Sequence, residues 1–121
     1  MVRLLAPKKG ALNLNLRNST LPANAIQYLT TSLSNFNYYL VTLNLKFCFL
    51  NFDQMIKLSN AIKLNKTLVR LDLSNNALKS PTMRFFLESM LDNSTLADLR
   101  LAGNFLDNEF AVDLAHLLEV N

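Results

Sequence analysis

Leucines recur at fixed intervals along this chain of 121 residues and predict where its strands lie. Three segments, 40–50, 68–78 and 96–106, align without a gap on the pattern L-x-x-L-x-L-x-x-(N or C)-x-L. They repeat every 28 residues, and a more degenerate copy at 11–21 precedes them at a spacing of 29. Within each segment leucines alternate with mostly polar residues. This alternation predicts a short strand with its leucines in the core and the residues between them at the surface.

The stretches between these segments show the spacing of amphipathic helices. In each stretch apolar residues fall at i, i+3 and i+7, the stripe by which a helix packs against a sheet. Aligned by period, they form three rows: Ile26, Met55, Met83 and Ala111; Leu29, Leu58, Phe86 and Leu114; Leu33, Ile62, Met90 and Leu118. Pro22, Ser80-Pro81 and Asn108 are start signals for three of these helices. The chain is therefore predicted to alternate short strands with helices, and the methionines of these rows to be core residues.

Two rows of small polar residues repeat with the same period. Cys48, Asn76 and Asn104 occupy the N-or-C position of the motif, where we expect a buried side chain to satisfy loop backbone groups that water cannot reach. Asn37, Asn65, Asn93 and Asn121 recur every 28 residues just after each helix, where we expect a left-handed backbone, which asparagine tolerates. Asn65 and Asn93 also begin two of the three glycosylation sequons, the third being at Asn18. The repeat period explains those two sequons without any glycan.

The motif and its period resemble the leucine-rich-repeat family over about residues 11 to 121, and the use of Cys48 and Asn76 at one position is similar to its ribonuclease-inhibitor-like type. The resemblance implies an α/β fold, a leucine-rich-repeat solenoid of about four repeats. It would be a right-handed superhelix with short parallel strands on the concave face and helices on the convex face. The family includes inhibitors, innate-immune sensors, GTPase-activating proteins, actin-regulating proteins and axonemal subunits, so the resemblance is specific for fold and not for function.

On this alignment, residues 1–10 are a basic N-terminal leader and residues 11–121 the repeat domain, with ribs at about 11–39, 40–67, 68–95 and 96–121. The sequence ends where the next strand should begin. We therefore expect the chain to be part of a longer protein, with its terminal ribs capped by another chain or by self-association.

The strand surface is the default binding face of such a solenoid. Neighbouring parallel strands lie about 4.8 Å apart, so we expect Arg70 to stand beside Asp98 and Asp72 beside Arg100. Such pairs either neutralise each other or recognise a partner. The predicted exposed positions are Asn13, Asn15, Arg17, Thr42, Asn44, Lys46, Arg70, Asp72, Ser74, Asp98, Arg100 and Ala102. Of these and the adjoining loop, we expect Arg17, Asn44, Lys46, Phe47, Arg70, Asp72, Asp98 and Arg100 to bind a protein partner.

Charge and aromatic residues are unevenly distributed. Residues 1–66 contain eight basic residues and one acidic residue, whereas residues 67–121 contain four basic and eight acidic residues. The basic end could contact an acidic protein surface such as that of tubulin, or it could simply be solvated. No arginine–aromatic recognition motif is present, so we do not expect a nucleic-acid partner. Phe49 and Phe105 are interpreted as core residues of the loops, whereas Phe47 takes an exposed loop position beside Lys46 and is the best hot-spot candidate.

Catalytic chemistry finds little support in the residues. His116 is the only histidine and is predicted on the outer side of a helix, and Cys48 is committed to its turn. No His/Cys cluster, glycine-rich phosphate loop or paired carboxylates can be assembled from the sequence. We expect no enzyme activity, no cofactor and no metal site.

A single cysteine cannot form an internal disulfide, which favours a reducing compartment. The sequence shows neither a membrane-spanning apolar run nor the apolar region of a secretory signal. We expect a cytoplasmic protein without membrane contact, with the cytoskeleton, the cilium or the nucleus as alternatives. The favoured function is a non-catalytic protein–protein interaction scaffold, a module of a larger intracellular protein or assembly, with a cytoskeletal or ciliary setting considered first. The alternatives are the sensor segment of a nucleotide-binding innate-immune-type receptor and a fragment of a GTPase-activating protein.

Overall fold

Strands and helices alternate along the chain in the computed structural model, which describes residues 12–35 and 39–120 without the side chains of 118–120. The strands are β1 (Leu12–Asn15), β2 (Leu40–Asn44), β3 (Arg70–Asp72) and β4 (Asp98–Arg100). The helices are α1 (Ala23–Ser34), α2 (Phe52–Leu64), α3 (Ser80–Met90) and α4 (Asn108–Val120). We call each strand, with the loop and helix that follow it, a unit, numbered one to four. The predicted alternation of strand and helix is confirmed, whereas the proposed leader lies outside the described residues.

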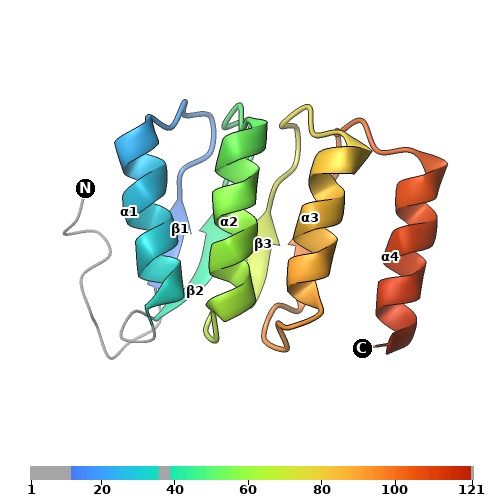
Figure 1. The fold of residues 1–121 in the computed structure, drawn as a ribbon. Helices are drawn as coiled ribbons and strands as arrows, with labels where there is room; N and C mark the ends of the chain where they lie inside the picture. Colours follow the sequence, from blue (N-terminus) through green and yellow to red (C-terminus); the bar gives the residue numbers. More distant parts are fainter. Residues whose placement is uncertain (1–11, 36–38, 121) are drawn as a thin grey trace.

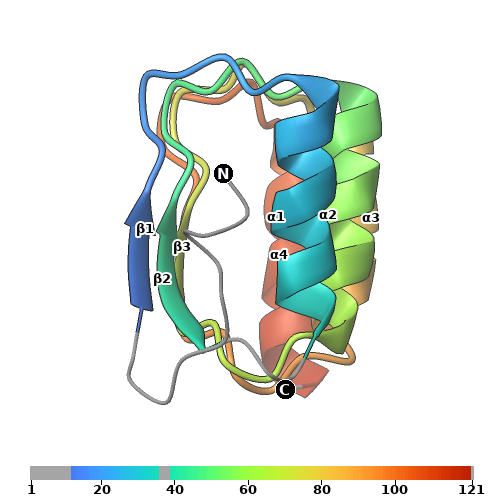
Figure 2. The ribbon, with the colours of Figure 1, turned by 90° about the vertical axis from the view of Figure 1, so that its left-hand side faces the viewer.

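The four strands form one parallel sheet in the order β1-β2-β3-β4, and the helices all lie on one side of it (Figure 1). Seen along the sheet, strands and helices form two layers joined by loops at both ends (Figure 2). Each strand is too short to bury much surface alone, and stacking beside its neighbour makes the core continuous. The opposite side of the sheet is not covered by any of the helices in the described part of the chain.

The strand leucines stack in register between the layers. Leu14 pairs with Leu43, Leu43 with Leu71, and Leu71 with Leu99. Leu43 and Leu71 are buried, while Leu14 and Leu99, in the outermost strands, are only partly buried. Full burial of one such leucine is worth about 1.5–3 kcal/mol, so this column is a main source of stability. The predicted stacking of leucines on adjacent parallel strands is confirmed.

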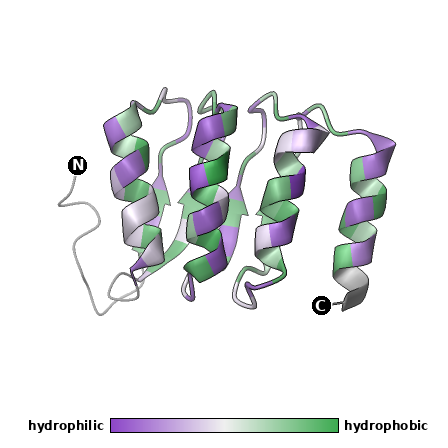
Figure 3. Ribbon diagram, viewed as in Figure 1, coloured by the Kyte–Doolittle hydropathy of each residue, from purple (hydrophilic) through white to green (hydrophobic). Residues whose placement is uncertain are grey.

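The predicted helix rows face the sheet in units one to three, with one correction in unit four. Ala111, expected in the core, is exposed, and the neighbouring Phe110 is buried instead, together with Leu117. A phenylalanine ring removes far more apolar area from water than a methyl group, so α4 turns Phe110 toward the sheet. Each helix carries alternating hydrophilic and hydrophobic bands, as expected for a helix with one buried side (Figure 3). The side chain of Leu118 lies outside the described residues.

The helix starts follow local hydrogen bonding. Pro22 precedes α1, and a proline lies in the first turn of α3. α2 begins with a capping box that the sequence analysis missed: the Asn51 side chain accepts the N–H of Gln54 at 2.8 Å, and the Gln54 side chain accepts the N–H of Asn51 at 2.9 Å. At the start of α4, Asp107 Oδ1 accepts the N–H of Phe110 at 2.9 Å.

The motif asparagines link neighbouring units through their side chains. That of Asn76 is buried, as predicted, and that of Asn104 is partly buried. Asn76 Oδ1 accepts the N–H groups of Cys48 (2.9 Å) and Leu50 (3.3 Å), and its amide donates to carbonyls of Leu45, Leu73 and Ser74. Asn104 repeats the arrangement one unit on, accepting the N–H of Asn76 at 2.9 Å. At the same position in unit two, the Cys48 thiol donates to the carbonyl of Leu16 at 3.0 Å. Backbone groups of the loops are thus satisfied without water.

The second asparagine row has a different role from the one predicted. Asn65 has an extended backbone (φ −75°, ψ 139°), and Asn93 is not among the described non-glycine residues with positive φ, so the expectation of left-handed geometry is wrong. Both side chains are buried and reach back to the preceding unit. Asn65 donates to the carbonyl of Leu33 at 2.9 Å, and Asn93 to that of Ile62 at 2.8 Å. The side-chain amide, and not the backbone conformation, therefore explains asparagine at these two positions. Asn37 and Asn121 lie outside the described residues.

Candidate functional site

Two rows of side chains run across the uncovered side of the sheet. The first row is Asn13, Thr42, Arg70 and Asp98, and the second is Asn15, Asn44, Asp72 and Arg100, as the strand register places them side by side. Every residue of both rows is polar or charged, because alternation along each strand sends the leucines to the opposite side. In the first row, the Thr42 hydroxyl donates to Asn13 Oδ1 at 2.6 Å. We call this surface the strand face.

An ion-pair cluster forms the β3–β4 end of the strand face. Arg70 Nε lies 2.9 Å from Asp98 Oδ2, so the predicted pairing of these residues is confirmed. Arg100 also turns to Asp98, at 3.3 Å. The hydrogen bond from Arg100, and then that from Arg70, hold the pKa of the Asp98 carboxyl below its ordinary value. One carboxylate therefore fixes two arginines on the surface.

Asp72 is the neighbour of Arg100 in the sheet, as predicted, but its carboxylate bonds to the backbone of its own chain segment. Its Oδ1 accepts the N–H of Ser74 at 2.9 Å, as Asn44 Oδ1 accepts that of Lys46 at 3.0 Å. These bonds shape the strand ends. Each of these two side chains is thereby held in place by one hydrogen bond. Ser74 itself is buried, so its predicted exposure is wrong.

The loops after β2 and β4 carry three exposed phenylalanines. Phe47 is 43% exposed, as predicted, with Lys46 Nζ 5.8 Å from its ring centroid. Phe49 and Phe105 are 71% and 68% exposed, so their assignment to the core is wrong. The residues on either side of Phe49, Cys48 and Leu50, are buried and take the inward positions. The side chain between them is left facing water.

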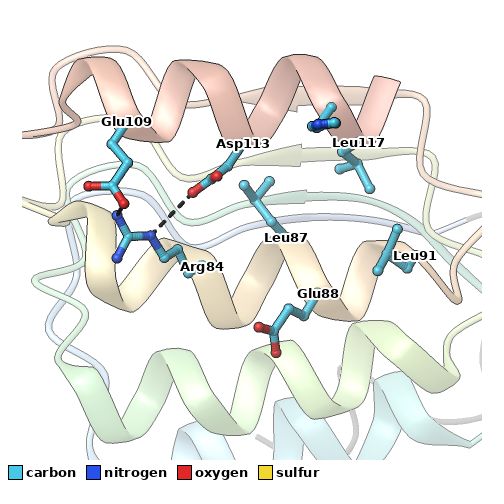
Figure 4. A pocket seen from close by; sticks show the side chains of 8 residues that line it. Arg84, Leu87, Glu88, Leu91, Glu109, Asp113 and Leu117 are labelled. Atoms are coloured by element: carbon cyan, nitrogen blue, oxygen red, sulfur yellow. Dashed lines mark hydrogen bonds and ion pairs between the residues drawn. The ribbon is translucent and has the colours of Figure 1, made fainter. Parts of the chain in front are cut away.

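A groove between α3 and α4 was not foreseen from the sequence. It has a volume of about 600 Å³, and Leu87, Leu91 and Leu117 lie along it (Figure 4). At one end Arg84 bridges α3 to α4, 2.7 Å from Glu109 and 3.2 Å from Asp113. Its hydrogen bond to Asp113 is the main cause of the raised pKa of Arg84. The Arg84–Asp113 ion pair could have been predicted, because the two residues are about one repeat period apart. The groove could not, because the spacing of α3 and α4 depends on the side chains of both helices.

The titratable groups of the described residues form no cluster suited to hold a metal ion. Burial raises the pKa of the Cys48 thiol, which keeps it in the neutral form that donates to Leu16. His116 is exposed on α4, as predicted. Among the described helices, none is long and apolar enough to span a bilayer.

Strands and helices alternate strictly, and asparagine side chains bond each unit to its neighbour. Together these features are those of a leucine-rich-repeat-like fold. Comparison with known proteins supports this class, although no family model matches the chain. The sequence is 35% identical over 100 residues to the mouse (Mus musculus) protein "NACHT, LRR and PYD domains-containing protein 14". That match covers 82% of this chain but only 10% of the mouse protein's length.

A solved structure shows the same fold. "Leiomodin-1 Actin-Binding Site 2 (ABS2)" matches with a TM-score of 0.83 over 99% of this chain and 69% of that chain, at 22% identity. At that identity the likeness is one of fold.

Proposed function

We propose that this chain is a non-catalytic protein-interaction module that binds a protein partner through its strand face. The observation that carries the proposal is the one-sided cover of the sheet. The helices pack on one side of it (Figure 2), and the strand register places two rows of polar residues on the strands that they leave uncovered on the other side. We also propose the finer fold assignment, a right-handed solenoid of about four ribs of the ribonuclease-inhibitor-like type, within a longer cytoplasmic protein.

The chemistry of the strand face suits a protein surface. A hollow of about 320 Å³ lies along both rows, from Asn13 and Asn15 to Arg70 and Arg100. Side-chain amides there offer donors and acceptors with little charge, while the Arg70–Asp98–Arg100 cluster holds two guanidinium groups in fixed positions. Preorganised groups lose less conformational entropy on binding than free ones.

The β1–β2 end of this face offers unpaired positive charge. Among the described residues, the side chains of Arg17 and Lys46 form no ion pair. They are therefore available to acidic groups of a partner, whose approach such charges accelerate.

Affinity capture from cell extract, with charge reversal at matched sites, tests the proposal. Lys46→Glu reverses a charge at the edge of the strand face, just after β2, and Lys57→Glu makes the same change on the exposed side of α2. The proposal expects Lys46→Glu to reduce the capture of specific proteins and Lys57→Glu to leave it unchanged. Loss of capture with Lys57→Glu alone would move the binding surface to the helices and overturn the proposal.

Two settings for such a module are each favoured by one observation. The 35% identity to a NACHT- and LRR-containing protein favours the repeat segment of a receptor of that kind. The fold likeness to a structure titled as an actin-binding site favours a cytoskeletal role. Cosedimentation with purified actin filaments and pull-down of actin monomers separate them. Binding to either form of actin that is weakened by Lys46→Glu supports the cytoskeletal setting, and the absence of binding to both removes it.

A further inference from the structure

The segment 46–52, which runs from the loop after β2 into the first residue of α2, presents three phenylalanines to water. Cys48 and Leu50 point inward and are buried, whereas Phe47, Phe49 and Phe52 are 43%, 71% and 50% exposed. We call these three residues the aromatic ridge. Phe52 also meets Phe85 of α3 edge to face, with ring centroids 5.8 Å apart, which extends the ridge toward unit three.

Two of the ridge residues have a backbone conformation that does not suit them. The position of Phe47 is left-handed in all four units, with φ of 62° at Asn18, 55° at Phe47, 58° at Asn75 and 71° at Gly103. Asparagine and glycine adopt this conformation readily, but a bulky residue with positive φ is an outlier. Phe49 is likewise left-handed, at φ 53°.

The fold does not require phenylalanine at these positions. Unit three builds the same loop with Asn75, Ala77 and Ser80 at the matching sites, and Ala77 has φ of 54°, within a degree of Phe49. Nor is the strain offset by full burial, because both side chains stay exposed. Strained residues retained at a surface point to a function, and large exposed aromatic side chains are typical of binding hot spots.

The charges around the aromatic ridge indicate the chemistry of its partner. The loops 16–22, 45–51 and 73–79 each carry one basic residue, Arg17, Lys46 and Lys79, and no acidic residue. In the fourth loop Asp107 is engaged in capping α4. Asp53 is the nearest acidic residue in sequence, at the start of α2. The loop edge of units one to three is therefore positively charged, with its aromatic residues in unit two.

We propose that the aromatic ridge is the docking site for an acidic segment of a partner protein that also carries large apolar side chains. The apolar side chains would pack on Phe47 and Phe49, and the carboxylates would face Lys46, Arg17 and Lys79. This inference rests on the proposed function, a protein-interaction module, and places its strongest contact at the loop edge.

Selection from a random peptide library on the immobilised protein, followed by fluorescence-anisotropy titration of the enriched peptides, tests the docking site. We expect enrichment of peptides that combine Asp or Glu with Trp, Phe or Leu. The double variant Phe47→Asn/Phe49→Ala, which copies the residues of unit three, should weaken their binding by about tenfold or more. Its thermal unfolding midpoint should stay at or above that of the parent protein. Phe105→Ala, which removes an equally exposed phenylalanine outside the ridge, serves as the matched control and should leave binding unchanged.

Several results would overturn the assignment. They are enrichment of peptides without acidic residues, no enrichment at all, or equal binding of the peptides to the double variant. The assignment would also be overturned if the parent protein self-associates and the double variant does not. The ridge would then bind a second copy of this chain. If Asn44→Ala or Arg70→Ala weakens peptide binding and the double variant does not, the strand-face proposal stands and the ridge proposal fails. Lys46→Glu changes the charge beside both surfaces and does not separate them, whereas Asn44→Ala and Arg70→Ala act on the strand face alone.

Discussion

The side chain of Asn76 reaches out of its own unit and accepts the backbone N–H of Cys48, 28 residues earlier, at 2.9 Å. The same oxygen accepts the N–H of Leu50, and the amide nitrogen donates to three carbonyls. One buried side chain thus satisfies loop groups of two units at once. Together with the leucine columns, this bonding couples the stability of each unit to its neighbour.

Removing this amide should destabilise the fold strongly. Asn76→Ala leaves the N–H groups of Cys48 and Leu50 buried without their acceptor, and each such group costs about 1–3 kcal/mol. We expect the free energy of unfolding to fall by about 3 kcal/mol, measured by urea denaturation. Asn60→Ala, on the exposed side of α2, is the control and should change it by less than about 0.5 kcal/mol. Equal effects of the two variants would contradict the role of Asn76.

Asn65→Gly distinguishes the two roles considered for the second asparagine row. Glycine suits a left-handed position, so that role predicts a neutral or stabilising change. The structure instead shows a buried amide that donates to Leu33 and accepts the N–H groups of Thr67 and Leu68. We therefore expect Asn65→Gly to lower the free energy of unfolding by about 2 kcal/mol. A gain in stability, measured in the same denaturation assay, would restore the left-handed interpretation.

Phe47→Asn should make the protein more stable, which is unusual for a substitution of a phenylalanine. Asn18 and Asn75 hold the same left-handed conformation at matching positions. Relief of the strain at φ 55° should raise the free energy of unfolding by roughly 0.5–1 kcal/mol. Differential scanning calorimetry measures the change, and a clear loss of stability would show that the Phe47 ring is needed for folding.

Asp107→Asn should reduce the sensitivity of the protein to acid. The N–H of Phe110, followed by Ser80, lowers the pKa of Asp107. A carboxyl whose pKa is lower in the folded state stabilises the fold above its unfolded-state pKa of about 3.9, and this contribution is lost as the pH falls through the folded-state pKa. Asparagine also caps helices but does not titrate.

The free energy of unfolding of Asp107→Asn should therefore match that of the parent near neutral pH and fall less between about pH 5 and pH 2. Asp107→Ala, which lacks the cap, should be less stable already at neutral pH. An acid response of Asp107→Asn equal to that of the parent would show that another group governs the loss.

The repeat period made the strand face predictable, because a constant spacing fixes which residues become lateral neighbours. Arg70 lies beside Asp98 for that reason. The same period could not tell a left-handed cap from a buried amide at Asn65, since both recur with the helix end. Phe49 was misassigned because the alternation of a strand does not continue through a loop with left-handed residues. The α3–α4 groove depends on how two helices pack, which neither helix sequence gives alone.

The most direct test of the central claim, that a partner binds the uncovered side of the sheet, is NMR. Backbone amide shifts of the labelled protein would be followed as a captured partner protein is added. We predict that the largest changes fall on Thr42, Asn44 and the loop around Phe47, with little change along the exposed side of α2. Changes centred on the helices, with the strand amides unmoved, would contradict it.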